Sequence, residues 1–136
     1  MKIVLDEKAI MPTRAHNTDA GLDLYSPKEF VVRAHNSATI DTGVHVEIPE
    51  GYAGFLKSKS GLNVKWSIQS DGVIDTGYTG SIVVKLYNHA NVPYVFKKGD
   101  KITQLVLVKI DLPELEVVDS LEETERGDNG FGSSGR

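Results

Sequence analysis

The chain has no cysteine among its 136 residues. This absence excludes disulfide bonds, thiol catalysis and metal sites built on thiolates, and it fits a reducing compartment without requiring one. Positive charge is also scarce, since 15 lysines and arginines face 19 aspartates and glutamates, for a formal net charge of −4. That balance argues against an extended surface that binds the phosphate backbone of nucleic acid, although binding a small anion needs only local positive charge.

Long apolar runs are missing as well. The first residues, Met1 to Glu7, place acidic side chains where the apolar core of a secretion signal would lie, and no later run approaches the length of a membrane span. We therefore expect a cytoplasmic protein with no membrane and no nucleic-acid partner. Its length suits one domain, which buries roughly two-thirds of the surface that the unfolded chain exposes.

Helical periodicity is almost absent, whereas alternating apolar and polar residues recur in the segments 44–48, 81–87 and 101–108. This period of two is typical of half-buried strands. Turn-forming residues separate these segments at the spacing typical of an all-β sandwich or barrel. Only residues 60–67 suit a short helix, with Ser60 as its N-cap and its first amides able to attract phosphate.

The apolar pattern stops at Leu121, and the residues from there to Arg136 are rich in glycine, serine and charge. This change predicts a β-barrel core over residues 1–120 and a flexible C-terminal arm over residues 121–136. An inert end is the usual meaning of such a terminus. The one aromatic residue of the arm, Phe131, lies between two glycines and points to a second use.

The most informative stretch is residues 72–81, which place the carboxylate of Asp75 and the ring of Tyr78 on a tight hairpin bounded by glycines. Glycine lets a flat ligand approach main-chain N–H and C=O groups directly. An aspartate in such a turn often caps its own backbone, and a tyrosine often packs on a strand. The hairpin alone therefore does not decide between a turn and a catalytic site.

Five short motifs follow one another along nearly the whole chain: Ala20 to Tyr25, Pro49 to Tyr52 continuing into Lys59 to Leu62, Gly72 to Gly80, Gly99 to Leu105, and Arg126-Gly127 with Gly130 to Ser133. Any one of them is a weak signal, but five in order are specific. In these motifs the chain resembles the trimeric dUTP nucleotidohydrolases, or dUTPases. The resemblance implies an all-β, jelly-roll-like distorted barrel with one short helix and a flexible C-terminal arm.

The resemblance also implies hydrolysis of dUTP to dUMP and pyrophosphate, which limits uracil in DNA and supplies dUMP. Asp75 would activate the water that attacks the α-phosphorus and would touch the sugar 3′-hydroxyl. Tyr78 would lie against the deoxyribose and leave no room for a 2′-hydroxyl. The main chain of Val73, Ile74 and Gly80 would bind the uracil edge, whose donor and acceptor pattern cytosine reverses.

Lys59, Ser60 and Gly61 would form the phosphate cradle, with Ser60 on the bridging oxygens. The family usually has arginine where Lys59 stands, and a lysine offers a point charge rather than a bidentate fork. A solvated strand edge is the alternative interpretation of this lysine-rich segment. Gln104 would meet phosphate or a fixed water, because an amide among apolar strand residues is costly when it is buried unpaired.

Magnesium would arrive on the triphosphate, because Mg²⁺ prefers waters and phosphate oxygens to an all-protein cage. No direct protein ligand is expected. Asp23 has two candidate roles, one through a water of the metal and one structural, and we expect the structural role. We expect Asp100 to serve only its turn, and the four histidines show no spacing typical of a metal site.

In the arm, Arg126 would pair with the terminal phosphate, Phe131 would stack on uracil, and Ser133 would close the phosphate end, with Gly132 letting the arm fold over the ligand. Ordering the arm costs entropy, so it should close only on nucleotide. The resemblance further implies a homotrimer with active sites shared between subunits. Apolar strand faces alone do not distinguish packing within one chain from packing between chains.

Three other functions compete with this interpretation. Two Asp-Thr-Gly segments match the signature of aspartic proteases, but the 34 positions from Asp41 to Asp75 are too few for two lobes. A dCTP deaminase would need a glutamate where this chain has Lys85. A sensor that binds dUTP without hydrolysing it stays open, although the intact Asp75 and arm argue against it.

Overall fold

The computed structural model describes residues 1–135. Within them lie nine strands and one short helix: β1 (Ile3–Leu5), β2 (Gly21–Tyr25), β3 (Phe30–Val32), β4 (Ser37–Val46), β5 (Tyr52–Lys57), α1 (Ser60–Trp66), β6 (Ile68–Ile74), β7 (Ser81–Asn88), β8 (Tyr94–Phe96) and β9 (Lys101–Lys109). The segments 81–87 and 101–108 fall in β7 and β9, and the segment 44–48 begins in β4 and runs two residues past its end. The prediction of an all-β fold is confirmed.

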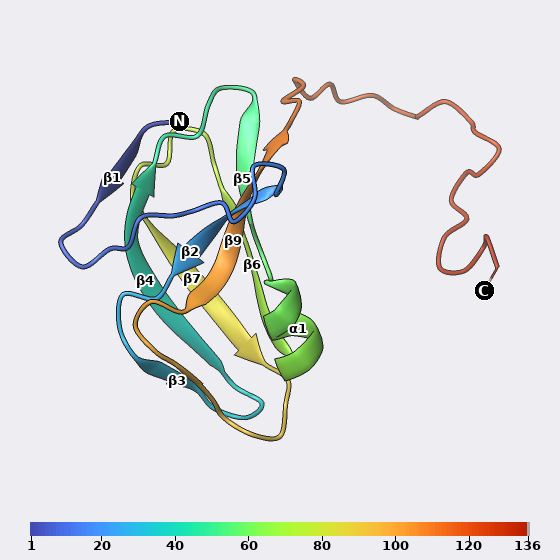
Figure 1. Cartoon of the computed structure of the whole chain (residues 1–136). Coiled ribbons are helices and arrows are strands. Elements are labelled where there is room, and N and C mark those ends of the chain that lie inside the picture. Colours follow the sequence, from blue (N-terminus) through green and yellow to red (C-terminus); the bar gives the residue numbers. More distant parts are fainter. Residues whose placement is uncertain (136) are drawn as a thin grey trace.

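Seven strands form one antiparallel sheet in the order β1-β4-β7-β6-β5-β9-β2, and β3 pairs with β8 in a separate two-stranded sheet. Figure 1 shows that the large sheet curls strongly rather than lying flat. Its two ends therefore face each other around one core, as in a jelly-roll-like half-barrel. Core side chains come from both ends, including Leu24 of β2, Ile40 of β4 and Ile102 of β9.

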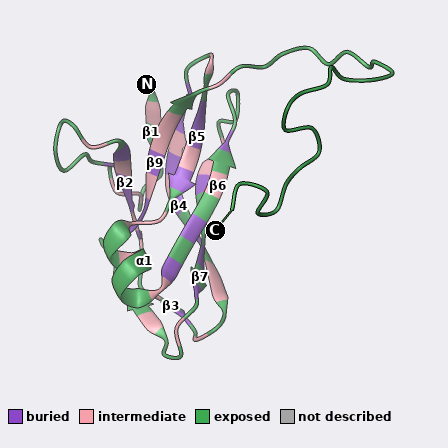
Figure 2. Ribbon diagram, turned by 90° about the vertical axis from the view of Figure 1, so that its right-hand side faces the viewer, coloured by how far each residue is buried: buried purple, intermediate pink, exposed green. Residues whose placement is uncertain are grey.

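Alternation along β7 shows how the sequence selects the inner face. Ile82, Val84 and Leu86 are fully buried, while Val83 and Lys85 point outward. The same bands of buried and exposed residues run along β6 (Figure 2). Each buried aliphatic side chain stabilises the fold by roughly 1.5 to 3 kcal/mol, so a slip of one residue in register would lose several such terms.

The helix α1 begins at Ser60, the residue predicted as its cap. Lys59, with extended backbone angles, is the N-cap, and its carbonyl accepts from the N–H of Asn63 at 2.9 Å. The prediction of Ser60 as the N-cap is therefore wrong, since Ser60 is already the first helical residue. At the other end Ser67 adopts a left-handed φ of 56°, which turns the chain into β6.

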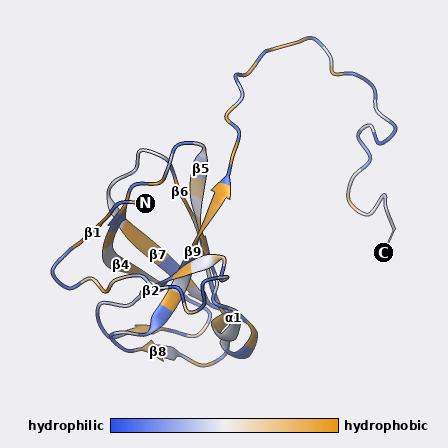
Figure 3. Ribbon diagram, turned by 45° about the horizontal axis from the view of Figure 1, so that its top comes forward, coloured by the Kyte–Doolittle hydropathy of each residue, from blue (hydrophilic) through white to orange (hydrophobic). Residues whose placement is uncertain are grey.

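Strand structure ends at Lys109, and residues 110–135 contain no helix or strand. This segment runs away from the body of the molecule (Figure 1). It mixes hydrophobic and hydrophilic residues along its length (Figure 3). Several of its exposed side chains are large and apolar: Leu112, Leu115, Val117, Val118, Leu121 and Phe131. Within residues 1–135, no helix has both the length and the apolar character that a membrane crossing needs.

Candidate active site

The hairpin that carries Asp75 is wider than its sequence predicted. β6 pairs with β7 only from Ile68 to Ser70, because beyond that point β6 follows β5 while β7 follows β4 around the curl of the sheet. The prediction of a tight hairpin is therefore wrong. The facing main-chain edges at 73–74 and 80–81 are not paired with each other, so their N–H and C=O groups line an open seam.

At the tip of this hairpin the chain turns tightly. The Tyr78 N–H donates to the carbonyl of Asp75 at 3.2 Å, and Gly77 takes a left-handed φ of 90°. Thr76 ties the tip to β5 through a 2.6 Å bond from its hydroxyl to the Tyr52 carbonyl. The Asp75 carboxylate is exposed, and among residues 1–135 it accepts no hydrogen bond. It does not cap its own turn, which leaves it available as a base.

Tyr78 lies over the glycine that follows it. Its hydroxyl donates to the carbonyl of Ser81 at 3.0 Å, and a Cβ placed on Gly80 would come within 2.5 Å of the ring carbon that bears the hydroxyl. The flanking glycine therefore makes room for the tyrosine itself. Gly80 lies against the hydroxyl end of the ring, and the side chain is about half exposed.

A second cluster lies where β5 leads into α1. The carboxylate of Asp23 is almost fully buried and is held by two lysines: Lys59 pairs with Oδ1, and Lys101 Nζ lies 2.7 Å from Oδ2. Burial alone would raise the pKa of Asp23, but bonds from Lys101 and Lys59 outweigh it and hold the pKa below its usual value. The same contact raises the pKa of Lys101.

This arrangement bears on the expected roles of Lys59 and Asp23. Lys59 is not free at the phosphate cradle, because its ammonium group is engaged with Asp23. Asp23 in turn has the structural role that we expected. A contact from Asp23 to a metal-bound water stays a prediction, and it would require one lysine to leave the carboxylate.

Gln104 joins the same cluster from β9, opposite Asp23 in the strand register. Its amide nitrogen donates to the carbonyl of Ser58 at 3.1 Å, and its side chain lies over Gly21, where a Cβ would come within 2.4 Å of Oε1. In this chain Gln104 therefore bonds to a backbone carbonyl, whereas we expected phosphate or a fixed water as its partner. A contact between Gln104 and phosphate stays a prediction.

The distance between the Asp75 hairpin and the Asp23 cluster can be estimated from Ser70 of β6. Its carbonyl accepts from the hydroxyl of Ser58 at 3.1 Å, which places the second cluster beside the middle of β6. A strand rises about 3.3 Å per residue, so the five steps from Ser70 to Asp75 cover about 16 Å. One chain therefore does not bring the candidate base and the candidate phosphate ligands together.

Within residues 121–135, the arm contacts neither the Asp75 hairpin nor the Asp23 cluster. Arg126 bonds only within the arm, where its Nε donates to the carbonyl of Asn129 at 3.0 Å. Phe131 is fully exposed, and Gly132 and Ser133 lie in the same exposed segment. The predicted roles of these four arm residues stay predictions.

A family model described as dUTPase matches residues 7–135. The chain belongs to the dUTPase family. A probable deoxyuridine 5′-triphosphate nucleotidohydrolase of Schizosaccharomyces pombe is 43% identical over 132 residues, which cover 96% of this chain and 94% of that protein. The deoxyuridine 5′-triphosphate nucleotidohydrolase of Arabidopsis thaliana is 44% identical over 132 residues, or 96% and 80% of the two chains.

Solved dUTPase structures have the same fold. A mutant dUTPase of Staphylococcus bacteriophage 80alpha, solved with dUpNHpp, superposes with a TM-score of 0.92 at 35% identity and covers 99% of this chain and 98% of that chain. A mutant dUTPase of phage phi11 of S. aureus, which coordinates a structural Mg(II) ion, gives a TM-score of 0.83 at 35% identity, with 90% and 98% covered.

Membership of the dUTPase family removes the protease and deaminase alternatives. Asp41, the first aspartate of the apparent protease pair, accepts from the N–H of Gly43 at 2.9 Å and from the hydroxyl of Ser81. Lys85 points outward on β7, with its ammonium group 5.4 Å from the ring centre of Tyr87. Neither residue has the contacts that those two chemistries need.

Sequence reasoning missed Lys101 and the reason for Gly21. Lys101 lies at the start of a strand like an ordinary lysine, and its position opposite Tyr25, two residues beyond Asp23 on β2, is set only by the pairing of β2 with β9. Gly21 is required because Gln104 lies on it. Both relationships join residues about eighty positions apart, so no local pattern in this dUTPase chain could have revealed them. Asp100 does serve its turn, accepting from the Lys97 N–H at 2.8 Å.

Proposed function

We propose that this chain hydrolyses dUTP to dUMP and pyrophosphate, with Asp75 as the general base. The observation that carries the proposal is the exposed, unbonded carboxylate of Asp75 beside an open seam of main-chain groups, in a member of the dUTPase family. Asp75 takes a proton from water as the water oxygen attacks the α-phosphorus. The bond from that phosphorus to the bridging oxygen breaks, and pyrophosphate leaves.

The open seam binds the base. Main-chain groups of Val73, Ile74 and Gly80 pair with the uracil edge, and β6 and β7 leave these edges free because they part after Ser70. Cytosine would place its hydrogen-bond donor opposite a main-chain donor there. Each buried group left mispaired in this way costs roughly 1 to 3 kcal/mol. Tyr78 packs against the sugar from its place over Gly80, and a 2′-hydroxyl would collide with its ring.

Ser60, Gly61 and Gln104 bind the phosphates, together with Lys59 once it leaves Asp23. Lys101 stays on the carboxylate, so that the release of Lys59 does not strand a buried charge. The residues present fit a metal that arrives on the triphosphate, since both oxygens of Asp23 are already held by lysines. When bound, Mg²⁺ neutralises negative charge on the phosphate oxygens.

The working molecule is a homotrimer with shared active sites. The separation of about 16 Å along β6 supports this, because a base and a phosphate ligand that act on neighbouring phosphoryl groups must lie within a few ångströms. The exposed apolar residues between Leu112 and Leu121 also support it, since they find no cover in one chain. A partner that covers them would extend the core to residue 120, leaving residues 121–136 as the arm.

The arm closes over the nucleotide. Arg126 pairs with the terminal phosphate, Phe131 stacks on uracil, and Ser133 binds the phosphate end, with Gly132 at the fold. Phe131 is fully exposed in the isolated chain, so burying its ring on a base would be favourable. We propose a cytoplasmic location as well, which the absence of cysteine supports.

A substrate panel tests the activity. Purified protein is incubated with Mg²⁺ and dUTP, dCTP, UTP or dTTP, while pyrophosphate and base identity are followed together. Pyrophosphate from dUTP alone supports the proposal. Uracil from dCTP would indicate a deaminase, and binding of dUTP without any product would indicate a sensor.

Mixed trimers test the sharing of sites. Asp75→Asn and Ser60→Ala chains are each expected to be nearly inactive alone, and co-refolding them should restore activity, because some sites then combine an intact Asp75 with an intact Ser60. Sites built within one chain would give no rescue. Light scattering on the same samples measures the number of subunits.

A further inference from the structure

β4 carries an irregularity beside the catalytic hairpin. Its pairing with β7 runs from Ser37 to Asp41 and resumes at His45, which lies opposite Ser81. Four steps along β4 therefore face only two along β7, and Gly43 takes a left-handed φ of 67° to accommodate the extra residues. The segment 41–45 is thus a bulge, and it contains the Asp-Thr-Gly sequence that the nucleotide chemistry leaves unused.

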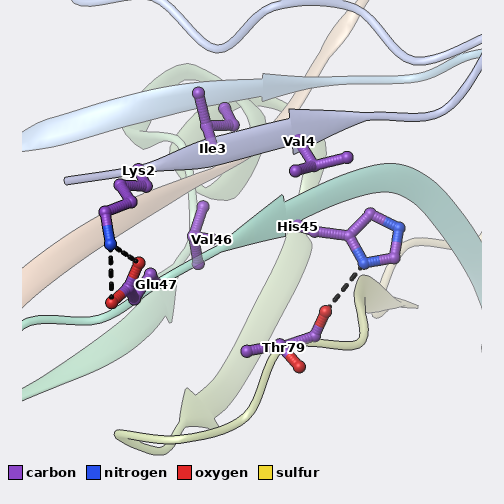
Figure 4. A pocket seen from close by; sticks show the side chains of 7 residues that line it. All are labelled: Lys2, Ile3, Val4, His45, Val46, Glu47 and Thr79. Atoms are coloured by element: carbon purple, nitrogen blue, oxygen red, sulfur yellow. Dashed lines mark hydrogen bonds and ion pairs between the residues drawn. The ribbon is translucent and has the colours of Figure 1, made fainter.

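Side chains of the bulge bind the end of the hairpin. Asp41 Oδ1 accepts from the hydroxyl of Ser81, and the hydroxyl of Thr42 donates to the carbonyl of Ile82 at 2.7 Å. His45 Nδ1 lies 2.8 Å from the carbonyl oxygen of Thr79 (Figure 4). These three contacts hold residues 79–82, the limb of the hairpin that carries Gly80 and supports the ring of Tyr78.

His45 has a second partner on its other nitrogen. Nε2 lies 3.3 Å from Oδ1 of Asp6, in the turn after β1. A carbonyl oxygen can only accept, so the bond to Thr79 requires a proton on Nδ1, and the contact with Asp6 requires one on Nε2. A neutral ring carries only one of these protons. Only the imidazolium form keeps both partners.

We infer that His45 is a positioning residue of the dUTP site, whose protonated form fixes Thr79 and with it the Tyr78–Gly80 segment. The inference rests on the proposed function, because it assigns no chemistry to His45 itself. In the neutral ring one contact must break. Either the Thr79 carbonyl loses its donor, or a nitrogen lone pair faces the Asp6 carboxylate.

The charged groups around His45 favour the imidazolium. Asp6 approaches from the turn after β1, and Asp41 lies on β4 itself, while Lys2 and Glu47 in the same pocket pair with each other at 2.9 Å (Figure 4). The bond to the Thr79 carbonyl, and then the Asp6 carboxylate, raise the pKa of His45 above its ordinary value, although partial burial opposes them. The anchor is therefore complete below pH 6.5 and is lost as the pH rises through the raised pKa.

Proton NMR of the four histidines tests the inference on the unmodified protein. The pKa of His45 is measured by titration in the free protein and with dUpNHpp and Mg²⁺. We expect a value above 6.5 in the free protein and a further rise on binding, since a ligand that prefers the anchored hairpin must stabilise the proton that anchors it. A pKa that the ligand leaves unmoved overturns the inference.

Kinetics provide the second test. We expect kcat/KM for dUTP to fall about tenfold in the unmodified enzyme as the pH rises through the pKa of His45. In His45→Asn the side-chain amide can donate to Thr79 without titrating, so this alkaline step should be absent. His45→Leu should be about tenfold less active at every pH. His89→Asn is the matched control and should keep the step. An alkaline step that survives in folded His45→Asn overturns the inference. If the unmodified protein does not turn over dUTP at pH 6, the proposed function is contradicted instead.

Discussion

Lys101 Nζ lies 2.7 Å from Oδ2 of Asp23, while Lys59 holds the other oxygen of the same buried carboxylate. The three groups carry one net positive charge next to Ser60 and Gln104. Two cations on one anion allow one of them to leave without exposing the anion. We therefore expect Lys59 to pair with Asp23 in the free protein and with a phosphate when the nucleotide binds.

Replacing Lys101 should weaken nucleotide binding without touching the chemistry. In Lys101→Gln the carboxylate depends on Lys59 alone, so moving Lys59 to phosphate leaves a buried charge with no cation. We expect KM for dUTP to rise roughly tenfold with kcat nearly unchanged. Lys98→Gln, an exposed lysine of the preceding turn, is the control. Equal KM values for the two variants would contradict the movement of Lys59 from Asp23 to phosphate.

Asp23 should make the free energy of unfolding depend on pH in the acid range. Because the folded state lowers its pKa below 3.8, the stabilisation is complete above about pH 5 and is lost as the pH falls through the folded value. Asp23→Asn should lower the free energy of unfolding at pH 7 by about 1 to 3 kcal/mol, less than for a fully buried pair because Lys101 is 42% exposed. Urea unfolding at several pH values checks this. An unchanged pH dependence in the variant would refute it.

Asp75→Asn should lower kcat by about 10² to 10⁴, the range for loss of a general base, while dUTP still binds. The substitution keeps the size of the side chain and removes its ability to take a proton. Isothermal titration with dUpNHpp measures binding, and pyrophosphate release measures turnover. The control is Asp71→Asn on β6, four residues earlier, where the carboxylate pairs with Lys57 at 3.0 Å; this variant should turn over normally. Near-normal turnover by Asp75→Asn would show that another group is the base.

Gly80→Ala should displace the ring of Tyr78. The new methyl would lie within 2.5 Å of a ring carbon, and the tyrosine can swing away because it is half exposed. We expect kcat/KM for dUTP to fall roughly tenfold and discrimination against UTP to weaken, since the ring no longer lies against the sugar. Adding Gly80→Ala to Tyr78→Ala should have little further effect. If the losses of kcat/KM in Gly80→Ala and Tyr78→Ala instead add up in the double variant, the two substitutions do not act through the same ring.

Removal of residues 126–136 should cripple hydrolysis without unfolding the core. None of residues 126–135 packs on the sheet, so thermal unfolding should shift by little. In contrast, kcat/KM should fall by roughly 10²-fold or more because the stacking ring and the phosphate ligands of the arm are gone. Phe131→Ala should produce part of the same loss. A truncated protein with normal kinetics would show that the arm takes no part.

The sequence predicted the inner face of the sheet well, because period-two alternation is a local property. Ile82, Val84 and Leu86 are inside simply because every second side chain of a strand points the same way. The helix was also placed within one residue. Its cap was misjudged because the carbonyl of Lys59, one residue before Ser60, accepts the first helical bond.

Long-range pairing lay beyond such reasoning. The width of the hairpin depends on β7 following β4 rather than β6, and the pairing of Lys101 with Asp23 depends on the register of β2 against β9. Both are set by the curl of the whole sheet. The Asp-Thr-Gly segment of the bulge at 41–45 matched one half of a protease signature, which its spacing ruled out, but its role as a bulge stayed hidden because its hydrogen bonds reach residues forty positions away.

The sequence by itself determined the strand content, the dUTPase motifs and the candidate base, because composition, periodicity and short motifs are written in neighbouring residues. The tertiary structure alone decided which charges meet, which backbone edges stay open and how far the base lies from the phosphate ligands. Those properties arise when the sheet curls and brings distant strands together. A lysine, a histidine or an aspartate acquires its role only from the partner that this curvature places beside it.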